Sequence, residues 1–249
     1  MSEPYAPDNL LDRLSDPATL DFHYGWFKRR ERELLERLLP QPGRDVLSVG
    51  AGWDVGRHLF PAPAFRLTAV DLDPVMVRLA LERDQADAAV VGRAGELPFA
   101  PESFDVVLYR LVLHHVAYQQ PLGPVIAEAA RLLRPGGALV VVEPNILHPV
   151  GAGLALANRL GVSERVHGTV DDLPLSPPAL KRHAQAAGLV AEVHAVTFLW
   201  RRLPRRLQSA LFPLDGLGSA PILRYLGHHV LLFALRPPIH SRGSPVYER

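Results

Sequence analysis

The chain has 249 residues, of which 48% are hydrophobic, so it is long enough to bury a sizeable core in one catalytic domain. Lysine and arginine number 27 against 26 acidic residues, and the resulting net charge of +1 gives no support for a nucleic-acid partner. Cysteine is absent, which excludes disulfides, thiolate metal sites and cysteine nucleophiles and is typical of a reducing compartment such as the cytoplasm.

Residues 1–43 are predicted to form an N-terminal helical cap. The first twenty residues carry acidic side chains where a secretory signal would need a basic start and an apolar run. Helical spacing of apolar side chains runs from Trp26 to Leu39, and two prolines and a glycine within residues 40–43 end it. No stretch reaches the roughly 18 uninterrupted apolar residues of a membrane span, so we expect a cytoplasmic protein with at most peripheral membrane contact.

A strand, a glycine-containing loop and a second strand follow the cap. The apolar run Asp45–Val49 leads directly into Gly50-Ala51-Gly52, and the next strand is predicted over Leu67–Asp71. The glycine pair lets the backbone turn sharply, and a helix expected after it would offer free N–H groups to an anionic group. Asp71 ends the second strand about 20 residues later, where an acidic side chain in this fold class accepts hydrogen bonds from ribose hydroxyls.

Strands and helices continue to alternate up to Glu143. The turn Arg134-Pro135-Gly136-Gly137 has a proline that stops the preceding helix and glycines that allow positive φ. The elements predicted in this part are a helix that starts at Pro74, strands over Ala88–Val91, Phe104–Tyr109 and Ala138–Val142, and a helix over Leu122–Leu133. Such alternation predicts an α/β fold with a parallel sheet.

The pattern changes after Glu143. Residues 144–175 look irregular and are expected on the substrate side, as is the basic, proline-broken segment 198–227. The remaining predicted elements are a helix over Pro177–Ala187 and strands over Val190–Thr197 and His229–Leu235. Because no repeat or linker indicates a second domain, residues 44–249 are expected to form one domain with these two insertions.

Four segments, in this order and spacing, resemble the successive motifs of class I S-adenosylmethionine-dependent methyltransferases, in particular the ubiquinone-biosynthesis-like type 11 group. They are Val46–Gly52, Val70–Pro74, Glu96–Phe99 with Ser103–Val107, and Leu132–Gly137. The resemblance spans roughly residues 44–143. It implies a Rossmann-like seven-stranded, mostly parallel sheet with helices on both faces and an antiparallel last strand, and S-adenosyl-L-methionine as the cofactor.

The same resemblance implies a cofactor site, residue by residue. It places the glycine loop against the methionine part of the cofactor, Asp71 on the ribose and Leu72 beside the adenine. Tyr109 and Arg110 match positions that border the sulfonium and the acceptor. The implied cofactor-binding residues are Gly50, Ala51, Gly52, Trp53, Asp71, Leu72, Arg93, Ala94, Gly95, Glu96 and Tyr109.

Three positions depart from the family's usual pattern and bear on cofactor affinity rather than on the fold. Ser48 stands where an acidic residue is common, Trp53-Asp54 where a small pair is usual, and Arg93 where aspartate is frequent. Asp54 is a candidate to supply the missing carboxylate, and Trp53 is a candidate to shield the methionine tail.

His114 and His115 are the candidate proton acceptors for a hydroxyl or amine substrate, since they follow the fourth strand at the carboxyl edge of the sheet. Alternatively, the pair opens the next helix and packs locally. His148 and His167 lie in the segment expected to cover the acceptor and are weaker candidates. No metal site is predicted, because no histidines combine helical i, i+4 spacing with nearby carboxylates. The adjacent His228-His229 is expected at the surface.

The acceptor is expected to be a small or lipid-like metabolite, and the oligomeric state is not predicted. The arginines within residues 201–206 are candidates to contact a phosphate-bearing or lipid-like acceptor or a membrane surface, or else form a solvated helix face. A NAD(P)-dependent oxidoreductase is the alternative enzyme, but Val55 stands where the dinucleotide fingerprint needs glycine. A non-catalytic methyltransferase-like binding protein is the third reading, indicated by Ser48, Trp53 and Arg93.

Overall fold

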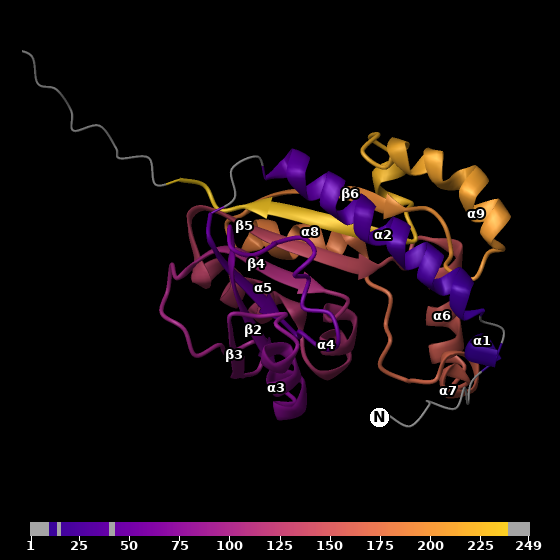
Figure 1. Cartoon of the computed structure of the whole chain (residues 1–249). Coiled ribbons are helices and arrows are strands. Elements are labelled where there is room, and N and C mark those ends of the chain that lie inside the picture. Colours follow the sequence, from indigo (N-terminus) through magenta and orange to yellow (C-terminus); the bar gives the residue numbers. More distant parts are fainter. Residues whose placement is uncertain (1–9, 14–15, 40–42, 239–249) are drawn as a thin grey trace, which may run out of the picture.

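The computed structural model describes residues 10–13, 16–39 and 43–238, and Figure 1 traces the chain. Seven strands form one sheet in the order β3-β2-β1-β4-β5-β7-β6, in which β7 is antiparallel to both neighbours and the other pairs are parallel. The strands are β1 (Asp45–Val49), β2 (Arg66–Asp71), β3 (Ala88–Val91), β4 (Phe104–Arg110), β5 (Leu133–Pro144), β6 (Val190–Thr197) and β7 (His229–Leu235). The predicted Rossmann-like α/β sheet with an antiparallel last strand is confirmed.

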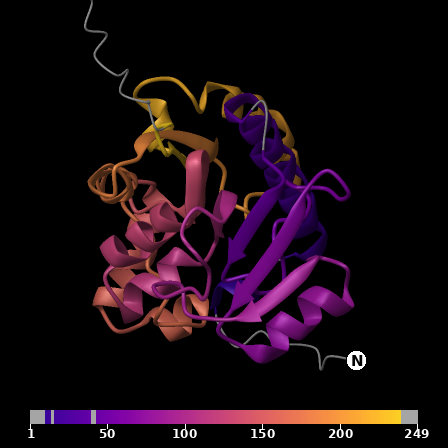
Figure 2. The same cartoon turned by 90° about the vertical axis from the view of Figure 1, so that its left-hand side faces the viewer.

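Helices cover both faces of this sheet, as predicted (Figures 1 and 2). The α-helices are α1 (Leu10–Arg13), α2 (Pro17–Leu38), α3 (Pro74–Glu82), α4 (Leu113–Gln119), α5 (Leu122–Leu132), α6 (Pro149–Arg159), α7 (Ser163–His167), α8 (Pro177–Ala186) and α9 (Arg205–Leu211), and the 3₁₀ helices are η1 (Phe212–Leu217) and η2 (Leu223–Tyr225). None of these described helices is both long enough and apolar enough to cross a membrane.

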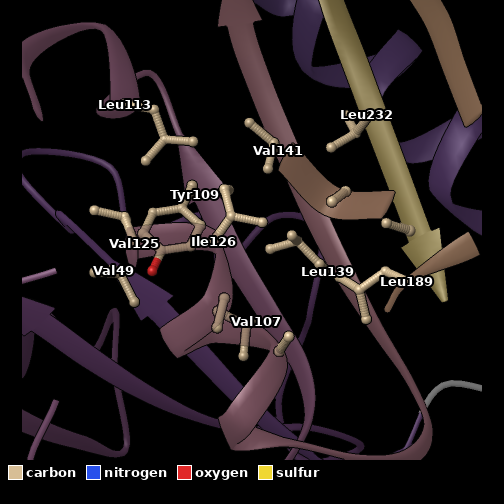
Figure 3. Close-up of a cluster of buried hydrophobic side chains, with 14 of the residues drawn as sticks. Val49, Val107, Tyr109, Leu113, Val125, Ile126, Leu139, Val141, Leu189 and Leu232 are labelled. Carbon is tan, nitrogen blue, oxygen red and sulfur yellow. The ribbon is translucent and has the colours of Figure 1, made fainter. Parts of the chain in front are cut away.

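The central strand β4 is buried on both of its faces, because successive side chains of a strand point to opposite sides of the sheet. On one face, Val107 and Tyr109 belong to the same core cluster as Ile126 of α5 (Figure 3). On the other face, Val106 shares a second cluster with Phe27 of α2. Burial on both faces explains why the sequence shows continuous apolar runs here rather than strict alternation.

The helix expected directly after the glycine loop is absent, so that prediction was wrong. Residues 50–65 form turns between β1 and β2. Gly52 and Gly56 have φ values of +48° and +79°, which a right-handed helix does not permit. Pro61 and Pro63 then interrupt the rest of the segment.

Helix α2 covers the face beside this turn segment instead. It begins at Pro17, earlier than the predicted start at Trp26, because the Asp16 side chain accepts a hydrogen bond from the Thr19 N–H at 2.9 Å and caps the helix. Leu34 of α2 packs in one cluster with Val55 and other apolar residues of the turn segment. The segment before the first strand is therefore part of the main core.

The segment expected to be irregular and the proline-broken segment after β6 both contain helices. Residues 144–175 include α6 and α7, and residues 198–227 include α9, η1 and η2. Glycines reduce the helical signal of α6, yet a Cβ on Gly151 would lie only 2.0 Å from the carbonyl oxygen of Asn145. Close packing therefore requires glycine at this position of the helix, although glycine has a low helix propensity.

The segment 134–137 was predicted as a turn that precedes the fifth strand, but it lies within β5. Gly136 has a φ of +83°, as expected, but Gly137 does not lie in the positive region. A Cβ on Gly137 would instead lie 2.8 Å from the carbonyl oxygen of Asp105, so this glycine permits close approach of two strands. The strand begins at Leu133 and continues through the turn.

A buried ion pair joins α2 to the end of β4. The Arg110 guanidinium donates to both carboxylate oxygens of Glu31, with Nε–Oε1 and Nη2–Oε2 distances of 2.8 and 2.9 Å. Both side chains are almost fully buried. Burial lowers the pKa of Arg110, but the Glu31 carboxylate outweighs burial and the net shift is upward. Arg110 therefore stays charged and depends on Glu31 as its counter-ion.

We predict that Glu31→Ala lowers the free energy of unfolding by about 3–5 kcal/mol, because it leaves Arg110 buried without its main counter-ion. The double variant Glu31→Leu/Arg110→Met should recover to within about 1 kcal/mol of the wild type, since apolar side chains can replace a buried pair. Urea unfolding followed by circular dichroism measures both values.

The matched control is Glu82→Ala, which breaks the exposed Arg78–Glu82 pair on α3. It should change the stability by less than about 0.5 kcal/mol. Equal effects of the Glu31 and Glu82 substitutions would contradict the assigned role of the buried pair.

Candidate functional site

The glycine loop and Asp71 meet at the carboxyl edge of β1 and β2, as their positions in the sequence predict. The Gly52 N–H donates to Asp71 Oδ2 at 2.8 Å, and the Asp73 N–H donates to Asp71 Oδ1 at 2.9 Å. A carboxylate offers about four acceptor positions, so two remain for hydroxyl groups of a ligand. Asp71 thus fixes the loop and still presents acceptor capacity at the edge of the sheet.

The three loop residues have different surroundings. Gly50 has a φ of +69°, and a Cβ there would lie 2.1 Å from the Val112 side chain that follows β4. Ala51 is buried in the core beneath the loop. A Cβ on Gly52 would meet nothing within 4 Å, so the loop has an open side at this residue. That open side can accept a ligand close to the backbone.

A tight turn over residues 93–96 lies beyond the end of β3 at this edge. Arg93 and Glu96 form an isolated antiparallel bridge, which leaves Ala94 and Gly95 at the tip. The Tyr109 hydroxyl donates to the Ala94 carbonyl at 3.4 Å from inside the core. Burial, followed by the charge of Glu128, raises the pKa of this fully buried tyrosine. Tyr109 therefore supports the turn from behind.

Two further predicted cofactor residues are exposed at the same edge. Leu72, next to Asp71, is 55% exposed and provides an apolar surface beside the carboxylate. Trp53 is 64% exposed, and the Arg83 guanidinium lies over its ring at 5.2 Å. Of the two, Leu72 has the chemistry expected for contact with a purine face.

The Asp54 carboxylate is engaged by cations of its own chain. It lies 2.8 Å from Lys28 Nζ and 3.2 Å from Arg110 Nη1, and His58 is 3.7 Å away. Burial raises the pKa of Asp54, but hydrogen bonding to His58 and the two cations outweigh burial, and the pKa falls far below its usual range. Asp54 thus joins the glycine loop to α2 and β4, while Ser48 is buried in β1.

His114 forms a buried dyad with Glu143 at the end of β5. The His114 Nδ1 lies 2.6 Å from Glu143 Oε2, and Glu143 Oε1 accepts the backbone N–H groups of Val112 and Leu113. Glu143 therefore caps the start of α4 and orients the imidazole. Burial lowers the pKa of His114, but Glu143, with Asp172 and Asp171 farther away, outweighs burial and raises it above its usual value.

His115, the next residue of α4, is less buried than His114. Its Nδ1 is 3.1 Å from Asp171 Oδ2, and its ring lies 4.1 Å from the His114 ring between centroids. Both histidines belong to α4, so the prediction that they follow the fourth strand is confirmed by the element order.

A cavity of about 290 Å³, which we call the histidine cavity, adjoins the end of β4. Its walls include His114, His115, His228, His229, Tyr24 and Trp200. Leu111 also lines it, and the next residue, Val112, packs against Gly50. The cavity and the glycine loop are thus separated by a single residue of the chain. A second cavity of about 370 Å³, between α2 and residues 58–65, contains none of the predicted site residues.

The expectation that His228 and His229 lie at the surface was wrong. His228 is buried and His229 is half-buried, and both line the histidine cavity, because β7 lies between β5 and β6. The arginine cluster also divides: Arg201 and Arg202 line the cavity, whereas Arg205 and Arg206 are exposed on α9. Sequence gave no indication of either arrangement, since both depend on packing between distant segments.

Other histidines have structural roles or lie outside the description. His148 caps α6 by accepting the Val150 N–H, and its Nε2 contacts the Phe198 carbonyl at 3.1 Å. The side chain of His167 lies outside the described part of the structure. Within the described residues, no group of three histidine or carboxylate side chains is arranged to hold a metal ion.

Comparison with known proteins agrees with this geometry. A family described as "Methyltransferase domain" matches residues 47–141. The chain is 35% identical over 103 residues to a demethylmenaquinone methyltransferase of Tropheryma whipplei, with 41% of this chain and 42% of that protein covered. It is 37% identical over 120 residues to a ubiquinone/menaquinone biosynthesis C-methyltransferase of Cereibacter sphaeroides, with 44% and 46% covered. The match thus spans less than half the length of these relatives.

A solved structure shares the fold over nearly the whole described chain. It is an S-adenosylmethionine-dependent methyltransferase of Thermotoga maritima, described as a possible histamine N-methyltransferase. The TM-score is 0.59 at 17% identity, and the match covers 88% of this chain and 91% of that one. Residues 47–141 thus match a methyltransferase domain, and the strand order and the glycine loop held by Asp71 agree with that match.

Proposed function

We propose that the protein transfers a methyl group from S-adenosylmethionine to a small-molecule acceptor held in the histidine cavity. One observation carries the proposal: the end of β4 borders both places, because Val112 packs on Gly50 while Leu111 and His114 line the cavity. Ligands of open α/β sheets bind at this carboxyl edge. The domain match supports the same chemistry.

The residues at the edge fit such a cofactor. Asp71 has two free acceptor positions for ribose hydroxyls, Leu72 offers an exposed apolar surface to a purine, and Gly52 has open space beside it. No helix directly follows the glycine loop, so the free N–H groups of a helix N-terminus are not available there for the carboxylate of the cofactor's methionine part. When bound, the cofactor supplies an electrophilic methyl group on a sulfonium.

The chain's own work is to align the acceptor and exclude water, because methyl transfer is an in-line displacement. Where the acceptor carries a hydroxyl or an amine, we assign proton removal to His114. Glu143 accepts from Nδ1, which leaves Nε2 as the proton acceptor. Asp172, 3.8 Å from that Nε2, then helps to stabilise the imidazolium. His115 would bind the acceptor beside it.

The acceptor is inferred to be planar and small. Imidazole and aromatic walls suit a planar molecule, and about 290 Å³ lies near the lower limit for ligand pockets, enough for one or two rings. Two relatives are named for quinone biosynthesis, which supports a small-molecule acceptor of this kind. Any lipid tail on such a molecule would extend outside the histidine cavity.

We assign the described part of residues 1–43 the role of a cap, and residues 144–175 and 198–227 the role of substrate-side elements. Leu11 and Tyr24 line the histidine cavity and are held by arginines that follow β6. Arg202 Nε donates to the Leu11 carbonyl at 2.9 Å, and Arg201 Nη1 donates to the Tyr24 hydroxyl at 2.6 Å. These contacts support closure of the cavity by the N-terminal segment.

We predict that Asp71→Ala weakens binding of S-adenosylhomocysteine about tenfold to a hundredfold, because hydrogen bonds to a charged group contribute about 1.5–3 kcal/mol. Asp71→Asn should have a smaller effect, since its amide oxygen still accepts one hydrogen bond. Isothermal titration calorimetry provides both dissociation constants.

Asp84→Asn is the matched control, because Asp84 is exposed and its φ of +53° is one that asparagine tolerates. Its affinity should equal that of the wild type. Unchanged affinity in Asp71→Ala, or no binding by the wild type at millimolar ligand, would overturn the cofactor assignment.

A pH titration tests the His114–Glu143 dyad. We predict that the pKa of His114 lies above 6.5 and falls in Glu143→Gln, because that variant loses the strongest attraction for the imidazolium. A base must be unprotonated, so the rate of transfer to a hydroxyl acceptor should rise with pH through the pKa of His114. Ring signals in NMR spectra recorded from pH 5 to pH 9 give this pKa directly.

Glu192→Gln provides the comparison for this measurement, because Glu192 neighbours a different histidine, His194 on β6. It should leave the pKa of His114 unchanged. A wild-type pKa at or below 6.5, or one insensitive to Glu143→Gln, is the result that would exclude the dyad.

A further inference from the structure

His228 and His229 form a pair that the proposed transfer step does not use. The Nδ1 atoms of the two rings lie 2.8 Å apart, within hydrogen-bonding distance, and the ring centroids are 4.4 Å apart. Both residues line the histidine cavity. His228 immediately precedes β7, and His229 is its first residue.

The surrounding structure fixes the position of this pair. The His228 N–H donates to the Thr197 carbonyl at 2.7 Å, and the His228 carbonyl accepts the Asn145 N–H at 3.0 Å. The His148 ring packs edge-on against His228 at 5.0 Å, and the Phe27 ring packs against His229 at 4.9 Å. Neighbouring strands and rings therefore hold both imidazoles.

Both imidazoles are neutral at pH 7. Burial lowers the pKa of each ring well below its usual value, and repulsion from nearby histidines and arginines adds to this effect. The short Nδ1–Nδ1 contact agrees, because it needs a bare nitrogen on one ring to accept a proton from the other.

The contact requires the two rings to be different tautomers. A neutral imidazole carries one N–H, so the ring that donates from Nδ1 has a bare Nε2, and the ring that accepts at Nδ1 carries its hydrogen on Nε2. Within the described part of the chain, neither Nε2 has a hydrogen-bond partner. Whichever ring donates, the pair offers one Nε2 donor and one Nε2 acceptor.

We propose that His228 and His229 recognise a planar molecule with a hydrogen-bond donor and an acceptor on neighbouring atoms, as in a cis-lactam. The proposal rests on the proposed function only in naming that molecule as the methyl acceptor. Trp200 and Tyr24 provide flat walls for such a ring system. A ligand that lacks either group would leave one imidazole nitrogen unpaired in a buried site, which costs affinity.

Two measurements test the pair. Long-range proton–nitrogen NMR spectra at pH 7 should show that the two rings together carry one Nδ1–H and one Nε2–H. Two protonated rings, or the same fixed tautomer in both, would contradict the proposal. In the second measurement, 2-quinolone is the probe, because its lactam presents adjacent N–H and carbonyl groups, and quinoline is its analogue without them.

We expect 2-quinolone to bind the full chain, with S-adenosylhomocysteine present, at least tenfold more tightly than quinoline. His228→Phe and His229→Phe keep an aromatic ring without its nitrogen atoms and should abolish that preference. His229→Gln replaces the ring with an amide that can donate or accept, and it should retain affinity within about threefold. His183→Phe on α8, outside the cavity, should have no effect. Circular dichroism confirms that each variant is folded.

Equal affinity for the two probes, no binding of 2-quinolone, or equal loss in His183→Phe would overturn the proposal. Binding of S-adenosylhomocysteine is measured separately in the same samples. If the cofactor analogue fails to bind while the tautomers and the probe preference are as expected, the proposed methyl transfer fails and the recognition site remains.

Discussion

The structure depends on one buried charge, the guanidinium at the end of the central strand. Arg110 lies where β4 reaches the functional edge of the sheet, and burial there demands a counter-ion. Glu31 of α2 supplies it with two hydrogen bonds, and Asp54 of the loop beyond Gly52 adds a third contact. This charge therefore joins the N-terminal helix, the central strand and the loop after β1. Since no helix follows that loop, α2 provides the support that a helix would otherwise give.

The same edge brings two chemically different environments together. On one side, Asp71 organises the glycine loop and retains acceptor capacity. On the other side, the histidine cavity contains two kinds of imidazole: His114, whose pKa Glu143 raises, and the neutral pair of His228 and His229. A proton acceptor and a neutral recognition element thus lie in one cavity. Their pKa values shift in opposite directions, because Glu143 outweighs burial at His114, whereas burial and then nearby charges lower the pKa of His228 and His229.

Local sequence patterns predicted the parts of this structure that depend on neighbouring residues. The apolar run before Gly50 and the acid at the end of β2 each have a short-range physical cause, whereas the seven-stranded sheet with its antiparallel last strand was expected only from the resemblance to class I methyltransferases. The pairing of Glu31 with Arg110 has no such signal, because 79 residues separate the two. The burial of His228 depends on the insertion of β7 between β5 and β6. Helix α6 was missed because its glycines serve close packing rather than helix propensity.

We infer that cofactor and acceptor meet at the end of β4. A crystal structure of the protein with S-adenosylhomocysteine tests it most directly. We expect the ribose hydroxyls to bind Asp71, the adenine to lie beside Leu72, and the sulfur to face the histidine cavity near Leu111. A ligand bound at any other place, or a sulfur that faces away from His114, would contradict the account.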